Sequence, residues 1–477
     1  MAFTTEQRYR AYADWSAEYI EKIKKNTALS PWRTHFHIET PHGLLNDPNG
    51  FSYFNGKFTL FYQYFPFGAA HGLKSWVHTE SKDLVHFKQT GTVIYPDTPL
   101  DSHGAYSGSA MQFGDKLFLF YTGNVRDENW LRHPYQIGAL MDQKGNIEKL
   151  NKILIEQPDD VTDHFRDPQI FNYQGQYYAI VGGQNLNKKG IIKLYKAHNN
   201  DYQQWDYVND LDFANDNTAY MMECPNLVFV DGKPVLIYCP QGLDKSVLDY
   251  QNIYPNMFKI GDNLDVEQAK LVNPTPLQQL DYGFECYATQ AFNAPDGRAL
   301  CISWLALPDM EYPTDKYDYQ GCLSLVKQLA IENGKLYQYP VEDIVNLRTS
   351  KEIFAERQHT NNIYELALNF APNIRHEMVL MADKNGNGLT IIVDTTKGEV
   401  IVDRSNCGEK FAEKFGTVRS CQIEKQATTA RIFIDRSVFE IFINGGEKVF
   451  SGRVFPNAEQ TGIAIKQGNP TGYFYQL

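Results

Sequence analysis

From residue 31 onward, short apolar and aromatic runs alternate along the chain with turns rich in Asn, Asp and Gly. Runs of this kind, bounded by turn residues, are typical of β-strands joined by hairpins. The pattern continues almost to the C-terminus, so it predicts an all-β protein. Over residues 5–25 a different pattern predicts a short amphipathic helix packed on the next domain. Its aromatic residues recur at helical spacing and are Tyr9, Tyr12, Trp15 and Tyr19.

One strand unit recurs five times along the chain. Each copy has a turn with a glycine followed by an apolar, aromatic strand, as in NGKFTLFYQY and GDKLFLFYTGN. The turn glycines lie about 60 residues apart and are Gly56, Gly114, Gly175, Gly232 and Gly297. A unit of about 60 residues fits four short strands with their turns, which is one propeller blade. The repeat therefore predicts a five-bladed β-propeller, since a sandwich would not give this near-constant spacing.

The repeat ends near residue 345. Beyond it, strands follow one another through short turns without a fixed period, which most simply predicts a β-sandwich of two sheets. We therefore expect three parts: an N-terminal helical extension over residues 1–30, a propeller over 31–345 and a sandwich domain over 346–477.

Three carboxylates occupy the same place in three of the five units. Asp47, Asp167 and Glu223 each stand at the start of the strand that precedes the turn glycine. Equivalent positions of a propeller face one central channel, so we expect these side chains to meet. Taken alone, NDPNG has the composition of a tight surface turn. The hairpin turn is already supplied downstream, and Pro48 and Pro168 push the aspartate before each of them into extended geometry.

Two carboxyl groups that flank the scissile bond are what glycoside hydrolysis requires. One must be ionised and one protonated, and mutual repulsion with partial burial raises the pKa of one of them. Glu223 is the better acid/base, because its longer side chain reaches the leaving oxygen. Asp47, held beside Pro48, is the better nucleophile. Arg166 favours the ionised form of Asp167, which suits that residue to binding hydroxyl groups; an ordinary ion pair is the alternative interpretation.

Composition narrows the range of partners. The net charge is −12 and no dense Lys/Arg run occurs, which argues against nucleic acid. Aromatic residues make up 14% of the chain, which favours strands and suits sugar-binding surfaces. No run approaches the ~18 apolar residues of a membrane span, and the N-terminus has no apolar stretch typical of a signal peptide. We expect a cytoplasmic monomer or homodimer whose partner is a small sugar.

The sequence predicts no metal and no cofactor. The 7 cysteines and 12 histidines show no metal-ligand spacing, so the cysteines are expected to be core residues or free thiols in a reducing compartment. No dinucleotide fingerprint follows any strand. Residues 383–394, DKNGNGLTIIVD, match part of a calcium loop. Strands flank this segment and its last acid is Asp394 instead of glutamate, so we predict a β-hairpin turn there.

Four segments together resemble the signature motifs of glycoside hydrolase family 32, the invertase-like β-fructosidases. They are GLLNDPNG (43–50), YSGS (106–109), FRDP (165–168) and ECP (223–225). The resemblance runs from about Trp32 to the C-terminus and includes IDRSVFEIFING in the last part of the chain. It implies a five-bladed propeller followed by a β-sandwich, in agreement with the repeat. It also implies hydrolysis of a β-fructofuranoside.

The resemblance implies roles for individual residues. Asp47 corresponds to the nucleophile on the anomeric carbon of fructose, and Glu223 to the acid/base. Asp167 corresponds to the group that holds fructose hydroxyls and stabilises the transition state. Cys224 stands where the family often has a cysteine beside the acid/base. The substrate contacts that the resemblance implies are Asn46, Gln63, Trp76, Ser107, Arg166, Tyr287 and Trp304.

The segment HGLKSWVH (71–78) departs from the pattern of many invertases, and Glu285 stands where an aspartate is common. The HGLKSW form and the N-terminal helix are similar to the sucrose-6-phosphate-cleaving bacterial members of the family. Lys74 and His71 are therefore predicted to contact a phosphate on the leaving glucose. The alternative for Lys74 is a solvated lysine at the rim.

Three other functions fit parts of the same pattern. A fructosyltransferase or fructan hydrolase would share the scaffold and differ in the acceptor that enters the site. A non-catalytic carbohydrate-binding propeller is disfavoured because all three carboxylates are present. Another five-bladed glycosidase, such as an arabinofuranosidase, also uses three acids, but NDPNG and ECP together argue against it.

Overall fold

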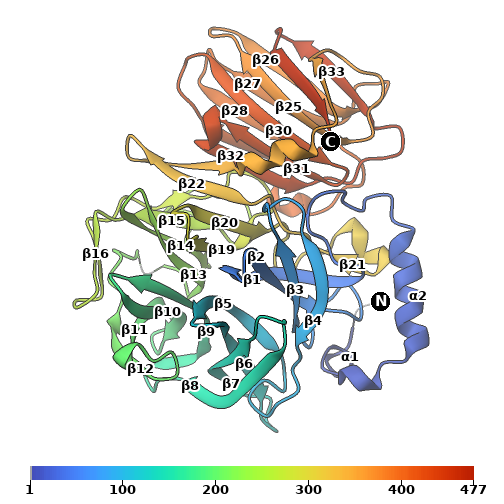
Figure 1. The fold of residues 1–477 in the computed structure, drawn as a ribbon. Helices are drawn as coiled ribbons and strands as arrows, with labels where there is room; N and C mark the ends of the chain where they lie inside the picture. The colour runs from blue at the N-terminus through green and yellow to red at the C-terminus, as the bar shows by residue number, and fades with distance from the viewer. Residues whose placement is uncertain (1–2, 217) are drawn as a thin grey trace.

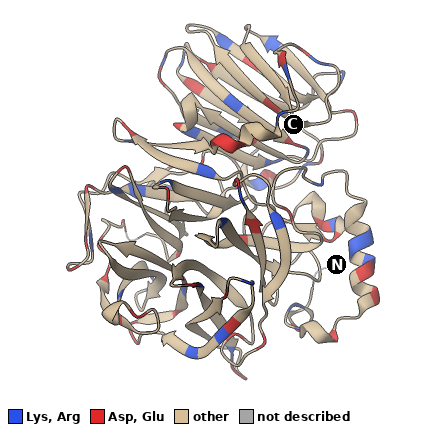
Figure 2. Cartoon of the chain, in the orientation of Figure 1, with Lys and Arg blue, Asp and Glu red and all other residues tan. Residues whose placement is uncertain are grey.

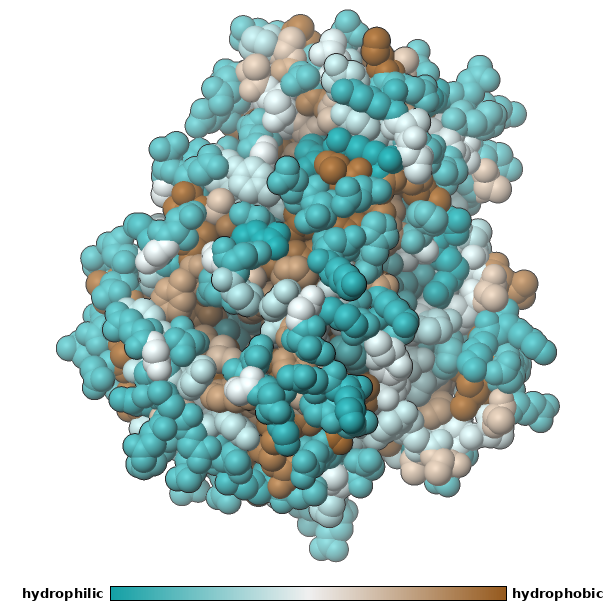
Figure 3. Space-filling view, in the orientation of Figure 1, coloured by the Kyte–Doolittle hydropathy of each residue, from teal (hydrophilic) through white to brown (hydrophobic). Residues whose placement is uncertain are grey.

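A computed structural model describes residues 3–216 and 218–477 of the chain (Figure 1). These residues contain 34 strands and two α-helices, so the prediction of a mainly β protein is confirmed. Lys and Arg are interspersed with Asp and Glu over the chain (Figure 2). On the face shown in Figure 3, hydrophilic residues cover most of the surface and hydrophobic ones occur in small groups. Within the described residues, neither helix has the length and apolar content needed to cross a lipid bilayer.

The N-terminal segment does not form the single helix predicted over residues 5–25. It forms two helices, α1 (Thr5–Arg8) and α2 (Ala17–Ala28), with the 3-10 turn η1 (Tyr12–Asp14) between them. The Ser16 hydroxyl accepts a hydrogen bond from the Tyr19 backbone N–H at 3.2 Å, which begins a new helix at that point. The single-helix prediction is therefore wrong.

The aromatic residues of this segment pack on the first sheet instead of lying along one helix face. Trp15 stacks on Phe67 with ring centroids 4.5 Å apart, and Tyr12 meets the same ring edge-on. The hydroxyl of Tyr19 donates to the Phe67 carbonyl at 2.8 Å. These tertiary contacts outweigh the helical period of the aromatic positions, because each ring finds its own place on Phe67 and its neighbours.

Between residues 43 and 340, five sheets follow one another, and their first strands contact each other in a closed ring. These inner strands are β1 (Gly43–Phe54), β5 (Ala105–Phe113), β9 (Val161–Tyr173), β13 (Met221–Val230) and β19 (Tyr287–Asn293). Each contacts the next in chain order, and β19 contacts β1. The first and last sheets thus meet, and no inner edge is left open.

The outer strands pair antiparallel, except for β21, which lies parallel to β1. In the first sheet they are β2 (Lys57–Phe65), β3 (Ser75–Ser81), β4 (Lys88–Ile94) and β21 (Tyr319–Gln320). In the second and third they are β6 (Lys116–Arg126), β7 (Arg132–Met141), β8 (Ile147–Ile155), β10 (Gln176–Asn185), β11 (Gly190–Ala197) and β12 (Trp205–Asp210). In the last two they are β14 (Lys233–Gln241), β15 (Met257–Ile260), β18 (Gln278–Gln279), β20 (Ala299–Trp304), β22 (Lys327–Glu332) and β23 (Lys335–Pro340). A separate pair is formed by β16 (Asn263–Asp265) and β17 (Lys270–Val272).

A polar side chain joins each inner strand to the backbone of the next. Gly108 N–H donates to Asn49, Ile170 to Ser109, Leu227 to Gln169, Ala291 to Asn226 and Phe51 to Gln290, at 2.8 to 3.1 Å. The five acceptors follow one another around the ring and end where they began. Buried backbone N–H groups need partners, so this belt fixes how neighbouring sheets sit against each other.

All five inner strands shift register at equivalent places. The shifts fall between Leu45 and Pro48, Ala105 and Gly108, Arg166 and Gln169, Glu223 and Asn226, and Tyr287 and Gln290. A bulge of this kind bends the strand and re-aims its side chains. Because two of the five strands have no proline at the shift, an X-Pro step is not its general cause.

The extended geometry predicted for Asp167, before Pro168, is also wrong, and Cys224, before Pro225, departs from it in the same way. Asp167 has φ 65° and Cys224 has φ 46°, which is the left-handed region. The bulge therefore outweighs the usual preference of a residue that precedes proline.

Two further sheets form the C-terminal part, the upper lobe in Figure 1. One contains β24 (Ser350–Ile353), β34 (Thr471–Gln476), β25 (Ile363–Phe370), β30 (Thr428–Asp435), β31 (Val438–Ile443) and β32 (Lys448–Arg453). The other contains β29 (Val418–Gln422), β28 (Glu399–Asp403), β27 (Leu389–Asp394), β26 (Arg375–Ala382) and β33 (Gly462–Gln467). Both supply side chains to one hydrophobic core, among them Leu366 and Ile391. The strands β26 and β27 pair directly, which confirms the hairpin predicted at the calcium-like segment.

Candidate active site

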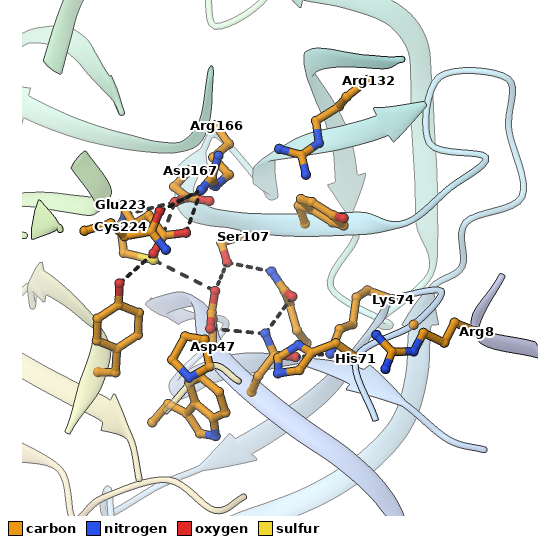
Figure 4. A pocket seen from close by; sticks show the side chains of 18 of the residues that line it. Arg8, Asp47, His71, Lys74, Ser107, Arg132, Arg166, Asp167, Glu223 and Cys224 are labelled. Carbon is orange, nitrogen blue, oxygen red and sulfur yellow. Dashed lines mark hydrogen bonds and ion pairs between the residues drawn. The ribbon is translucent and has the colours of Figure 1, made fainter. Parts of the chain in front are cut away.

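A cavity of about 360 Å³ opens where the register shifts of the inner strands lie (Figure 4). Every inner strand contributes a side chain to its wall: Asp47 from β1, Ser107 from β5, Asp167 from β9, Glu223 from β13 and Tyr287 from β19. Residues far apart in the sequence therefore meet at one end of the ring. The bulges produce this convergence, because they turn one side chain of each strand toward the common axis.

Eleven of the twelve site residues named from the sequence line this cavity: Asn46, Asp47, Gln63, His71, Lys74, Ser107, Arg166, Asp167, Glu223, Tyr287 and Trp304. Trp76 does not. Its side chain is fully buried among Phe61 and Tyr121, and its indole N–H donates to the Tyr106 carbonyl at 3.1 Å. The assignment of Trp76 as a substrate contact is thus corrected: it supports Tyr106, which does line the cavity.

Asp47 accepts hydrogen bonds on both of its carboxylate oxygens. Ser107 donates to Oδ2, and the Asn46 amide donates to Oδ1 at 3.1 Å. Gln63 links these two donors, since it donates to Ser107 Oγ at 2.6 Å and accepts from Asn46 at 2.8 Å. Burial raises the pKa of Asp47, the bond from Ser107 lowers it, and the charge of Glu223 raises it again. The carboxylate is thus held in one orientation by donors that are themselves held.

Glu223 also has a donor on each oxygen. Arg166 Nη2 donates to Oε1 at 2.7 Å, and the Tyr287 hydroxyl donates to Oε2 at 2.6 Å. Arg166 Nε lies 4.0 Å from Asp167 Oδ2, so the guanidinium pairs mainly with Glu223 and only loosely with its neighbour in sequence. The ion pair inferred from the adjacent Arg166–Asp167 sequence is present, but it is the weaker of two, because the arginine side chain reaches across to β13.

Burial raises the pKa of Asp167 to about 7 even though Arg166 opposes the shift. The charges of Glu223 and Asp47 add to the rise. Arg166 thus favours the ionised form of Asp167, as expected, but burial outweighs this effect. Asp167 Oδ2 accepts from the Cys224 backbone N–H at 2.9 Å. The Cys224 thiol lies 3.6 Å from Asp167 Oδ2 and 3.9 Å from Asp47 Oδ2, so both carboxylates approach one sulfur atom.

Lys74 and His71 both line the cavity, and each also contacts a neighbouring side chain. Lys74 is buried, and its Nζ donates to Asn46 Oδ1 at 2.6 Å. Burial lowers the pKa of Lys74 to about 7, although Asp47 raises it. His71 meets Trp304 edge-on, with ring centroids 5.9 Å apart, and burial lowers its pKa well below the ordinary value. Lys74 is thus not a solvated rim residue, since it is buried and belongs to the chain of donors behind Asp47.

Sequence reasoning missed part of the opposite wall, which is formed by Arg8, Tyr9, Trp130 and Arg132. Arg8 and Tyr9 fall within the predicted helix, but periodicity cannot show that this segment borders a cavity. Trp130 carried a weak signal, because a large aromatic in the polar loop RDENWLRHPY is typical of a contact surface. The sequence position of Arg132 gave no sign that its side chain lines the cavity.

Two held carboxyl groups across a small polar cavity suit glycosyl transfer to water. Two family models match the chain, the glycosyl hydrolases family 32 N-terminal domain over residues 37–340 and the family 32 C-terminal domain over residues 341–473. This chain belongs to glycosyl hydrolase family 32. Its resemblance to the family is confirmed, and it is a glycoside hydrolase.

Three relatives illustrate the similarity. A sucrose-6-phosphate hydrolase of Streptococcus mutans is 64% identical over 470 residues, which cover 98% of each chain. The structure of a sucrose-6-phosphate hydrolase from Lactobacillus gasseri matches with a TM-score of 0.97 at 44% identity and covers 100% of this chain and 99% of that one. A mutant of a Bombyx mori family 32 beta-fructofuranosidase, solved with sucrose, matches with a TM-score of 0.82 at 29% identity and covers 96% and 97% of the two chains.

Proposed function

We propose that this protein is a retaining β-fructofuranosidase that hydrolyses sucrose 6-phosphate, and sucrose less efficiently. The observation that carries the proposal is the convergence of Asp47 and Glu223 in one cavity of a family 32 chain. The identity of 64% to a sucrose-6-phosphate hydrolase supports the phosphorylated substrate. A fructosyltransferase or fructan hydrolase is the second candidate, since it would use the same carboxyl groups with another acceptor.

In the first step, an Asp47 carboxylate oxygen attacks the anomeric carbon of the fructosyl unit. The bond from that carbon to the glycosidic oxygen breaks, and Glu223 gives its proton to the departing oxygen. A fructosyl ester on Asp47 and a free glucose 6-phosphate result. Ser107 and Asn46, which donate to the Asp47 oxygens, orient the carboxylate for attack.

In the second step, Glu223 takes a proton from a water molecule, whose oxygen attacks the same carbon. The ester bond breaks, and Asp47 returns as a carboxylate while fructose is released with its original configuration. Arg166 and Tyr287, which donate to Glu223, orient this carboxyl group in both steps. Asp167 is assigned to binding fructose hydroxyls; Gln63 supports this site, and Trp304 forms part of its wall.

The architecture we propose is a five-bladed β-propeller over residues 31–345, followed by a β-sandwich over 346–477 and preceded by a helical extension over 1–30. Five sheets with contacting inner strands support the propeller, and a core shared by two sheets supports the sandwich. We also propose a cytoplasmic location. The seven cysteines of the described residues are unpaired and buried, which suits a reducing compartment.

The direct test compares kcat/KM of the purified protein for sucrose 6-phosphate and for sucrose, together with NMR of the first fructose released. We expect a higher value for the phosphorylated sugar and β-fructofuranose as the first product. Equal values would contradict the phosphate preference, and α-fructofuranose would contradict retention. Oligosaccharide formation at high sucrose would favour the fructosyltransferase alternative.

A further inference from the structure

The wall of the cavity that sequence reasoning missed carries two arginines without a protein partner. Arg8 comes from the last position of α1, and Arg132 from the first position of β7. In Figure 4 both lie on the side of the cavity away from Glu223. Among the residues that the structure describes, no carboxylate forms an ion pair with either side chain, and Arg132 Nε is buried without a hydrogen bond.

Arg132 is half-buried and its Nε has lost water without gaining a hydrogen bond, which is unfavourable, whereas Arg8 is exposed at the mouth of the same cavity. The arginines deeper in the protein show the usual arrangement: Arg404 pairs with Glu285 at 2.7 Å, and Arg166 pairs with Glu223 at the same distance. Arg8 and Arg132 also face other cationic groups. Arg8 lies near enough to Lys74 to lower its pKa, and Arg166 likewise affects Arg132. Asp163 acts on Arg132 only from a distance and forms no ion pair with it among the described residues, so this wall keeps positive charge that is open to an anion.

The backbone that carries Arg8 is fixed at the cavity. The Leu73 N–H donates to the Arg8 carbonyl at 2.7 Å. The segment approaches so closely that a Cβ on Gly72 would lie 2.6 Å from this carbonyl oxygen. The ring of Tyr9 meets Trp130, in the loop before β7, with centroids 5.1 Å apart. The N-terminal segment and the β6–β7 loop thus hold each other, which places Arg8 and Arg132 on one wall.

We propose that Arg8 and Arg132 bind the phosphate group of the substrate's leaving sugar and so determine the preference for a phosphorylated substrate. This assignment rests on the proposed function, and it replaces Lys74 and His71 as the phosphate ligands. A guanidinium group offers a planar pair of donors that matches two phosphate oxygens, and two of them balance a charge of nearly −2. Lys74 is already bonded to Asn46 and so contributes to the fructose side.

The test measures kcat/KM for sucrose 6-phosphate and for sucrose with Arg8→Gln and Arg132→Gln, and reports the ratio of the two values. Each variant is expected to lower this ratio by about 10- to 100-fold, the effect of losing a charged hydrogen bond. Arg298→Gln is the matched control. It removes a guanidinium that pairs with Asp296 at 2.7 Å in a turn of the fifth sheet and does not line the cavity, so its ratio should equal that of the unmodified protein.

A second measurement, product inhibition, keeps the proposal testable if a variant folds poorly. Inhibition of sucrose hydrolysis by glucose 6-phosphate should weaken in both variants, whereas inhibition by glucose should not change. If the unmodified protein prefers sucrose 6-phosphate and both variants keep that preference, the assignment of the two arginines is wrong and the proposed function stands. If the unmodified protein shows no preference, the phosphate part of the proposed function itself fails. A variant whose kcat/KM falls equally for sucrose 6-phosphate and for sucrose also contradicts a role at the phosphate.

Discussion

The two sides of the cavity are built differently. On the carboxylate side, Asp47 and Glu223 stand on bulged inner strands, and each has a donor on both oxygens. On the cationic side, Arg8 and Arg132 come from α1 and the start of β7, and neither forms an ion pair in the described part of the chain. The carboxylates of one side are held by protein donors, whereas the guanidinium groups of the other side form no ion pair within the described residues.

This difference separates reactivity from specificity. The groups that react are fixed by five strands and a belt of side-chain bonds, which suits pre-organised catalysis. The groups assigned to the leaving sugar belong to peripheral segments, where sequence can change without disturbing the ring. The comparison predicts that changes on the carboxylate side lower activity on every substrate, while changes on the cationic side alter the choice between substrates.

The largest effect is expected from Asp47→Asn. The amide cannot form the fructosyl ester, so kcat should fall by about 10⁴-fold or more on both sucrose and sucrose 6-phosphate. Asp115→Asn, in an exposed turn of the same ring, should leave kcat unchanged. Steady-state kinetics on both sugars checks this. Full activity of the Asp47 variant would remove the basis for assigning the carboxylate side to chemistry.

Glu223→Gln is expected to lower kcat by about 10² to 10⁴-fold on both sugars, because general acid and base catalysis is lost. With an aryl fructoside, whose leaving group needs no proton, added azide should restore turnover and yield the β-fructosyl azide. Product analysis by NMR checks the configuration. An inverted azide, or rescue of Asp47→Asn with retention, would show that the two carboxyl groups have other roles.

Lys74→Met tests whether Lys74 belongs to the carboxylate side or to the cationic side of the cavity. Because Lys74 donates to Asn46 behind Asp47, we expect kcat/KM to fall by about 10-fold for sucrose and sucrose 6-phosphate alike. The ratio of the two values should therefore stay as it is in the unmodified protein. If kcat/KM fell only for sucrose 6-phosphate, Lys74 would be a phosphate ligand, and the two sides of the cavity would not differ in the way described.

Much of the ring was predictable because the chain repeats. The period of the turn glycines located the five inner strands, and the position of Asp47 within its unit identified Asp167 and Glu223 as neighbours in space. The belt residues, such as Asn49 and Gln169, follow the same period, although their sequence context resembles turns. The N-terminal helix was predicted wrongly, because its aromatic spacing reflects contacts with Phe67 and not a continuous helix.

The partners of the site residues were not predictable from the sequence. Arg166 is adjacent to Asp167 in the chain, yet it bonds to Glu223 across the ring. The left-handed backbone at Asp167 has no signature in an Asp-Pro step, which favours extended geometry. Arg8 and Arg132 are brought to one wall by Tyr9 and Trp130, a contact between segments that share no repeat.

Asp167 gives the smallest expected effect, and it concerns stability instead of rate. Burial raises the pKa of this carboxyl from 3.8 to about 7, and Arg166 only partly opposes the rise. Because the folded-state pKa is higher, the contribution of Asp167 to stability is present in full below about pH 4 and is lost as the pH rises through 7. In Asp167→Asn the side chain keeps its shape, but it cannot carry the buried negative charge.

Asp167→Asn should therefore raise the melting temperature by a few degrees at pH 8, and the gain should disappear near pH 4. Thermal melts across this range check the sign, with the exposed Asp115→Asn as a control that shows no pH-dependent gain. A lower melting temperature of the variant at pH 8 would mean that Arg166 stabilises an ionised Asp167 after all. The carboxylate side would then contain a balanced ion pair at this position, and its contrast with the unpaired arginines would rest on Asp47 and Glu223 alone.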